Sequence, residues 1–147
     1  MHTTRIPRDF REFLKLLTAH EARFLVIGGY AVNAFGYVRN TIDLDLWIAA
    51  DAVNKRRVIL AVRDFAFPSA PDDLLDTPNT ILRMGVPPLR IEVLQSISGV
   101  EFDECWGRRE LLEAEDLTIP MISLADLKAN KLAAGRPKDL LDLQELT

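Results

Sequence analysis

The chain has 147 residues and a net charge of -4, with 48% apolar and 27% charged residues. This length suits one domain with its own core, and the acidic balance excludes a broadly basic surface for duplex nucleic acid, although not a local basic patch. The single cysteine, Cys105, excludes an intrachain disulfide and multi-cysteine zinc sites, and it is compatible with a reducing, cytoplasmic location. No apolar run approaches the length of a membrane span, so we expect no membrane partner.

Apolar periodicity predicts helices and strands that alternate through the first part of the chain. The segment RFLVIGG indicates a buried strand that stops at a glycine pair, and TIDLDLWIA, which alternates with period two, is the clearest strand. The predicted elements, in order, are a helix over 8–20, a strand over 23–29, a short helix over 30–37, a strand over 41–49 and a helix over 51–64 capped by Asp51.

The second part of the chain begins with a loop rich in Pro, Asp and Ser over residues 67–80. After it we expect strands over 81–86 and 89–95, a short helix over 101–107, two short strands within 108–123, and helices over 123–135 and 136–146. Residues 1–147 are thus expected to form one α/β (α+β) domain, a mixed β-sheet flanked by helices, with C-terminal helices from about residue 123.

Two aspartates interrupt the apolar strand over residues 41–49. Side chains at i and i+2 of a strand share a face, so Asp43 and Asp45 lie on one face about 7 Å apart along the backbone, opposite Leu44 and Leu46. Such carboxylates repel each other unless water or a cation intervenes, and Mg²⁺ prefers carboxylates, waters and phosphates as ligands. The alternative is a solvated polar strand face, although Trp47 shares it.

A third acid and a glycine pair extend this pattern. Glu92 lies mid-strand between Ile91 and Val93, and it can approach the two aspartates if the strands are neighbours. Gly28 and Gly29 follow a strand and open a helix, where glycine permits close backbone approach and free N–H groups can face phosphate. The segment matches neither the dinucleotide-binding fingerprint nor a Walker P-loop.

This ordered set resembles the nucleotidyltransferase superfamily related to DNA polymerase β. The matching segments are VIGGY, then DLDL after thirteen residues between Gly29 and Asp43, and later IEVL. The resemblance is greatest to small bacterial nucleotidyltransferase-like proteins, including those of toxin–antitoxin and phage-defence loci. It rests there on GYVRNTIDLDLWI and on ISLADLKANKLAAGRPKDLLDL, and it covers the chain from about Arg23 to Leu146.

The resemblance implies a catalytic and metal-binding set of Asp43, Asp45 and Glu92, with two Mg²⁺ ions expected alongside a bound NTP such as ATP. It also implies nucleotide-binding positions, namely Gly28, Gly29, Tyr30, Arg39, Thr41, Lys131 and Lys138, and Asp139 belongs to the same terminal motif. The sequence departs from the family pattern at Tyr30, where many members have a small or hydroxyl residue, and at Glu92, where many have Asp.

The expected function is therefore Mg²⁺-dependent transfer of NMP from an NTP to a hydroxyl of tRNA, protein or a small molecule. The alternative is a binding module of the same fold with weak or no activity, acting as an antitoxin-type partner of a toxin. A third reading is a structural domain with an incidental acidic strand. A homodimer stays open as a further partner, because it could build a composite basic groove.

Overall fold

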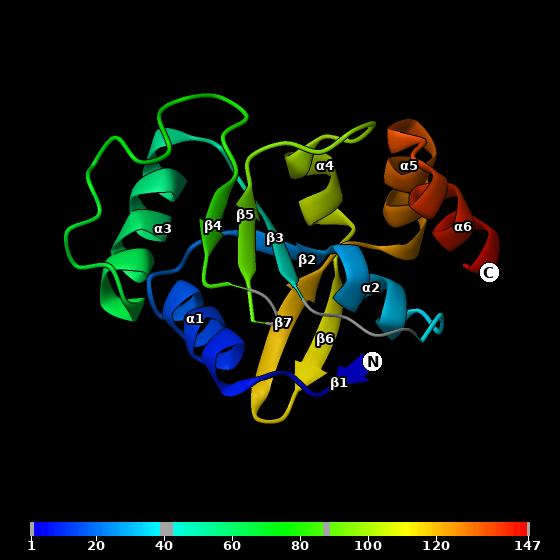
Figure 1. The fold of residues 1–147 in the computed structure, drawn as a ribbon, viewed down its shortest axis with the longest axis horizontal. Helices are drawn as coiled ribbons and strands as arrows, with labels where there is room; N and C mark the ends of the chain where they lie inside the picture. Colours follow the sequence, from blue (N-terminus) through cyan, green and yellow to red (C-terminus); the bar gives the residue numbers. More distant parts are fainter. Residues whose placement is uncertain (1, 39–42, 87–88, 147) are drawn as a thin grey trace.

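The computed structural model describes residues 2–38, 43–86 and 89–146 (Figure 1). Its helices and strands follow the alternating order expected from the sequence. They are β1 (His2–Thr4), α1 (Arg8–Ala19), β2 (Phe24–Ile27), α2 (Gly28–Ala34), β3 (Leu44–Ile48), α3 (Ala52–Phe65), β4 (Leu82–Met84), β5 (Ile91–Leu94), α4 (Phe102–Gly107), β6 (Glu110–Ala114), β7 (Leu117–Met121), α5 (Leu124–Ala134) and α6 (Pro137–Glu145).

The strands form one mixed seven-stranded sheet in the order β1-β6-β7-β2-β3-β5-β4. β2 pairs antiparallel with β3, and β3 pairs parallel with β5. In this register Asp45 lies between Ile27 of β2 and Glu92 of β5. The first acidic strand and the later one are therefore direct neighbours, which is the condition that the sequence left open for Glu92.

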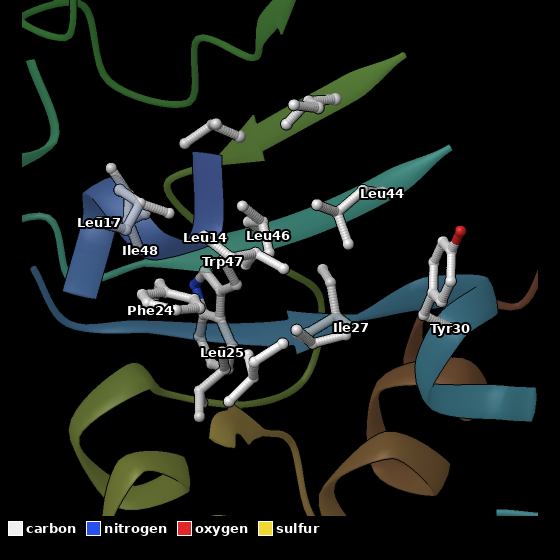
Figure 2. Packing of buried hydrophobic residues seen from close by; sticks show 14 of the residues in the cluster. Leu14, Leu17, Phe24, Leu25, Ile27, Tyr30, Leu44, Leu46, Trp47 and Ile48 are labelled. Atoms are coloured by element: carbon white, nitrogen blue, oxygen red, sulfur yellow. The ribbon is translucent and has the colours of Figure 1, made fainter. Parts of the chain in front are cut away.

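β3 is buried on both of its faces. Leu44, Leu46 and Ile48 are at most 1% exposed, and Figure 2 shows them in the cluster that includes α1. On the opposite face Trp47 is also 1% exposed, and its ring meets Phe102 of α4 edge-on with centroids 5.2 Å apart. The aspartate face is therefore not a uniformly solvated surface: α4 covers one end, and the acids lie at the other.

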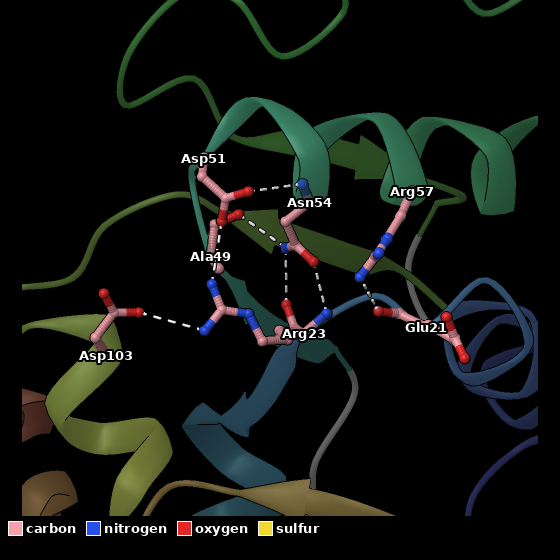
Figure 3. A network of polar contacts seen from close by, with 7 residues as sticks. All are labelled: Glu21, Arg23, Ala49, Asp51, Asn54, Arg57 and Asp103. Carbon is pink, nitrogen blue, oxygen red and sulfur yellow. Dashed lines mark hydrogen bonds and ion pairs between the residues drawn. The ribbon is translucent and has the colours of Figure 1, made fainter.

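A buried asparagine of α3 hydrogen-bonds to the residue before β2 and to the residue after β3 (Figure 3). The Asn54 side-chain oxygen accepts a hydrogen bond from the Arg23 backbone N–H at 2.7 Å, and its Nδ2 donates to the carbonyls of Arg23 and Ala49 at 3.0 and 2.8 Å. Asp51 caps α3 by accepting from the Asn54 N–H, and it also pairs with Arg23. This network fixes where β3 ends and α3 begins.

The structure differs from the sequence expectations at several boundaries. β1 was not expected; it pairs in parallel with β6. The glycine pair opens α2 as expected, since the helix spans Gly28–Ala34, and β2 therefore ends at Ile27 instead of extending over the glycines. The two strands expected within 108–123 are confirmed as the antiparallel pair β6 and β7. Among the helices that the structure describes, none has the length and apolar character needed to cross a membrane.

Candidate active site

A cavity of about 740 Å³ lies where β3 and β5 face the C-terminal helices. Acidic residues and glycines form one side, and basic residues come from β4, from the residue before β5, from α5 and α6, and from the residue that precedes α6. The charged and glycine residues that line it are Gly28, Gly29, Asp43, Asp45, Arg83, Arg90, Glu92, Lys131, Arg136 and Lys138. The cavity is thus built by segments from both halves of the chain.

The parallel pairing of β3 with β5 brings the three acids together. Asp45 and Glu92 are register partners, and Asp43 lies just before β3, where the Leu44 N–H donates to the Arg90 carbonyl. Parallel neighbours in register point their side chains to the same face, so Asp45 and Glu92 both face the cavity. The sequence-predicted acidic set therefore shares one cavity.

The backbone of Gly28 lies directly against the side chain of Asp45. Its φ is +65°, and a Cβ atom at this position would lie 2.2 Å from Oδ2 of Asp45. Residues with a side chain adopt this φ only with strain, and a Cβ atom at this position would force the Asp45 carboxylate to shift. The close backbone approach expected at the glycine pair is thus first an approach to the Asp45 carboxylate.

The surroundings of Asp45 disfavour its ionised form. Burial, followed by repulsion from Glu92 and Asp43, raises its pKa from 3.8 to about 6, and Lys138 and Lys131 only partly oppose this shift. A cation placed among these carboxylates would remove the repulsion. The electrostatics of the site therefore favour a positively charged ligand.

Two arginines that the sequence analysis did not select contact these acids. Arg90 Nη2 donates to Asp43 Oδ2 at 2.8 Å, and Arg90 Nε lies 3.4 Å from Glu92 Oε1. Arg83 Nε donates to the same Glu92 oxygen at 3.2 Å. The strand pattern held a signal for both. Arg90 precedes Glu92 by two residues on the same face, and Arg83 on β4 is the register partner of Glu92 on β5.

The opposite wall contains a buried ionic cluster between α5 and α6. Lys131 is 5% exposed, and its Nζ lies 3.3 Å from Asp139 Oδ1 and 3.1 Å from Asp142 Oδ2. Burial favours the neutral form of Asp139, but Arg136 and Lys131 outweigh it and hold the pKa of that carboxyl below its ordinary value. Lys131 thus lines the cavity and also anchors α6 to α5.

The remaining predicted positions are distributed differently. Lys138 lines the cavity and is exposed, and no ion pair joins it to another described residue. Tyr30 is not brought to the cavity wall; it is 6% exposed in the core, where its ring meets Phe10 edge-on. Arg39 and Thr41 lie outside the described residues.

The oxygen donors of the acidic residues suit Mg²⁺. Carboxylate oxygens are the ligands that this ion prefers, and Oδ1 of Asp43 is buried without a hydrogen-bond partner in the described part of the chain. No three acidic, His or Cys side chains among the described residues are already arranged to share one ion. The chemistry therefore fits, while the carboxylates would need to rearrange around a metal.

Comparison with known proteins gives matches at the level of structure. No family model and no curated protein matches the chain. A protein of Thermotoga maritima with a provisional nucleotidyltransferase assignment superposes with a TM-score of 0.62 at 13% identity, covering 96% of this chain and 94% of the other. This chain has a nucleotidyltransferase fold.

A second structure supports the same conclusion. The lincosamide antibiotic adenylyltransferase LnuA, in a lincomycin-bound crystal structure, superposes with a TM-score of 0.51 at 14% identity, covering 97% of this chain and 96% of the other. The expected mixed sheet flanked by helices is therefore confirmed as a nucleotidyltransferase fold. At these identities the likeness concerns the fold alone, so activity is argued from the cavity.

Proposed function

We propose that this protein is a Mg²⁺-dependent nucleotidyltransferase that moves NMP from an NTP to a hydroxyl acceptor. The observation that carries the proposal is the placement of Asp43, Asp45 and Glu92 on neighbouring strands around a cavity of about 740 Å³. Basic residues of the C-terminal helices line the same cavity. Acids for a metal and cations for a polyphosphate are the two requirements of phosphoryl chemistry.

Asp43, Asp45 and Glu92 would hold the metal. When bound, Mg²⁺ would supply charge stabilisation for the attacking and leaving oxygens of an in-line displacement. Glu92 would also orient the acceptor hydroxyl, because its carboxylate lines the cavity beside Asp45. Gly28 keeps the space beside Asp45 free of side-chain atoms, which leaves that carboxylate accessible from the cavity.

The triphosphate would lie toward the basic wall. Lys138 is the strongest candidate for direct phosphate contact, because it is exposed and its charge already acts on Asp45. Lys131 would act on the triphosphate mainly by long-range electrostatic attraction, because its ammonium group already pairs with Asp139 and Asp142. We therefore assign Lys138 to binding and Lys131 to the support of the wall.

A small molecule is the first acceptor class to test. The support is the similar fold of a lincosamide antibiotic adenylyltransferase, whose structure contains lincomycin. The cavity also has a less charged part lined by Leu94, Ser96, Ile97, Ser98 and Asn130. Such a mixture of apolar and neutral polar groups suits an uncharged hydroxyl-bearing compound. RNA and protein acceptors are the other arms of the experiment.

The experiment is label transfer from each of the four NTPs, in Mg²⁺, to a panel of hydroxylated small molecules, tRNA and cell-extract protein. We expect transfer by the wild type and at least about a 100-fold loss in Asp43→Ala, because positioning and charge stabilisation supply most of the rate. Asp76→Ala is the matched control, because Asp76 is an exposed acid that is not among the residues lining the cavity. Transfer that never exceeds the Asp43→Ala level with any acceptor would refute the proposal.

One observation favours the non-catalytic, antitoxin-type alternative. Leu132, Leu140 and Leu141 on α5 and α6 are 47–65% exposed, and exposed leucines are common where helices meet a partner. This alternative predicts co-purification of a stable partner and no thermal stabilisation by Mg²⁺ with any NTP. The label-transfer experiment separates the two functions.

A further inference from the structure

Arg90 bridges the acidic strands in the place where a metal would bind. Among the described residues, it is the one cation that contacts both Asp43 and Glu92, at 2.8 and 3.4 Å. Its side chain is 31% exposed and lines the cavity. Arg83, by comparison, pairs with Glu92 and with no other acid in the described part of the chain.

The bridge leaves hydrogen-bonding groups unused. Asp43 Oδ1 and Arg90 Nε are both buried, and neither has a hydrogen-bond partner among the residues that the structure describes. A guanidinium can make two parallel hydrogen bonds to one carboxylate or phosphate, and that geometry is stronger than the single bond formed here. Arg90 would therefore gain from exchanging Asp43 for a phosphate.

Arg90 also opposes a metal ion at Asp43. The described carboxylates do not yet form a group that could share one metal ion. A guanidinium on Asp43 and a divalent cation on the same carboxylate would repel each other at short range. Metal binding at Asp43 must therefore displace Arg90 or proceed against its charge.

We propose that Arg90 competes with the metal for Asp43 and Glu92, and that it transfers to the triphosphate when the metal–nucleotide complex binds. This inference rests on the proposed nucleotidyltransferase function and adds a positioning residue to it. The exchange makes metal binding weak in the absence of nucleotide. It also couples the binding of metal and nucleotide, because both ligands favour the state in which Arg90 has left Asp43. A simple structural ion pair would not produce this coupling.

The test measures Mn²⁺ binding by electron paramagnetic resonance, without nucleotide, in wild type, Arg90→Gln and Arg83→Gln. Removal of either arginine deletes one positive charge beside Glu92, but only Arg90 touches Asp43. We expect Arg90→Gln to bind Mn²⁺ at least about fivefold more tightly than wild type, the low end of typical coupling between sites. Arg83→Gln should change the affinity less.

The second measurement is the affinity for a non-hydrolysable ATP analogue in excess Mg²⁺. Arg90→Gln should bind it at least about fivefold more weakly, because the phosphate partner is lost while the metal site is intact. Arg90→Lys, which keeps the charge but lacks the two-pronged group, should lie between wild type and Arg90→Gln in both measurements. Circular dichroism checks that each variant is folded, and Arg90→Lys replaces Arg90→Gln if the latter is not.

The outcomes separate this inference from the function on which it rests. Unchanged or weaker Mn²⁺ binding in Arg90→Gln would overturn the competition, and tighter binding of both metal and analogue would overturn the transfer to phosphate. Either result leaves the nucleotidyltransferase proposal intact if wild type binds Mn²⁺ with the analogue. If no variant binds Mn²⁺ or the analogue under any condition, the proposed function fails and the role of Arg90 fails with it.

Discussion

Oδ2 of Asp45 occupies the space in which a side chain at Gly28 would begin, 2.2 Å from the position of a Cβ atom. The strand-to-helix turn and the acidic strand are therefore built around each other. A substitution in the turn must disturb the carboxylate, even though the two residues are far apart in the sequence.

Gly28→Ala should consequently lower the free energy of unfolding by more than an alanine at another position of positive φ. We expect a loss of about 2–4 kcal/mol in the free energy of unfolding, from backbone strain of about 1 kcal/mol plus the displacement of Asp45. Gly135→Ala is the matched control, because Gly135 has the same φ of +65° but no contact closer than 3.7 Å. Equal losses in the two variants, measured by urea denaturation, would show that the Asp45 contact is unimportant.

Replacing Asp45 with Asn should stabilise the fold at neutral pH. Because burial and the neighbouring Glu92 and Asp43 raise the Asp45 pKa from 3.8 to about 6, its ionised form is disfavoured in the folded state. This cost is fully present above pH 6, shrinks as the pH falls through 6, and is absent below 3.8. The shift corresponds to at most about 3 kcal/mol.

Unfolding of wild type and Asp45→Asn should therefore be compared at pH 8 and pH 4 without divalent metal. The variant should be the more stable at pH 8, and the difference should shrink at pH 4. Asp76→Asn, an exposed acid outside the cavity, should show neither effect. A destabilised Asp45→Asn at pH 8 would contradict this account of the site's charge.

Lys131→Met should destabilise the C-terminal helices. The substitution leaves Asp139 and Asp142, both 0% exposed, without their shared ammonium partner. Removing one member of a buried ionic group costs about 3–5 kcal/mol. Denaturation monitored by circular dichroism measures the loss, and the double variant Lys131→Met/Asp142→Asn should recover part of it. If Lys131 served the nucleotide alone, Lys131→Met would leave stability unchanged.

Asn54→Ala should weaken the junction of β2, β3 and α3. It removes three hydrogen bonds to the backbone at 2.7–3.0 Å, and the Arg23 N–H and the Ala49 carbonyl lose the Asn54 side chain as their partner. The expected loss is about 2–4 kcal/mol by chemical denaturation. Arg57→Ala, which removes one exposed bond to the Glu21 carbonyl, should lose less than about 0.5 kcal/mol. Similar losses of unfolding free energy in Asn54→Ala and Arg57→Ala would show that the Asn54 hydrogen bonds do not stabilise this junction.

Much of the fold could be predicted from the sequence because its signals are local. The alternation around Leu44 and Leu46 predicted β3 and its core face, and the glycine pair predicted a turn into a helix. β1 was missed because three residues carry no periodic pattern, and only its pairing with β6 defines it as a strand.

The site could be predicted only in part, because its residues come together through the pairing of distant strands. The three acids could be grouped once β3 and β5 were assumed to be neighbours, a relation that depends on the whole sheet. Arg83 and Arg90 were missed because an arginine beside an acid on a strand is common, and its meaning depends on cross-strand register. The burial of Tyr30 against Phe10 likewise depends on how α2 packs on α1.

The parallel pairing of Val26 with Met121 has a consequence for synthesis of the chain. β2 can gain its second neighbour only after the chain has been synthesised through β7, and Lys138 follows later still. The nascent chain would therefore expose Asp43, Asp45 and Glu92 well before their basic counterpart exists. A complete cavity thus requires synthesis through Lys138, and a chain terminated before α5 would carry the acids without the opposite wall.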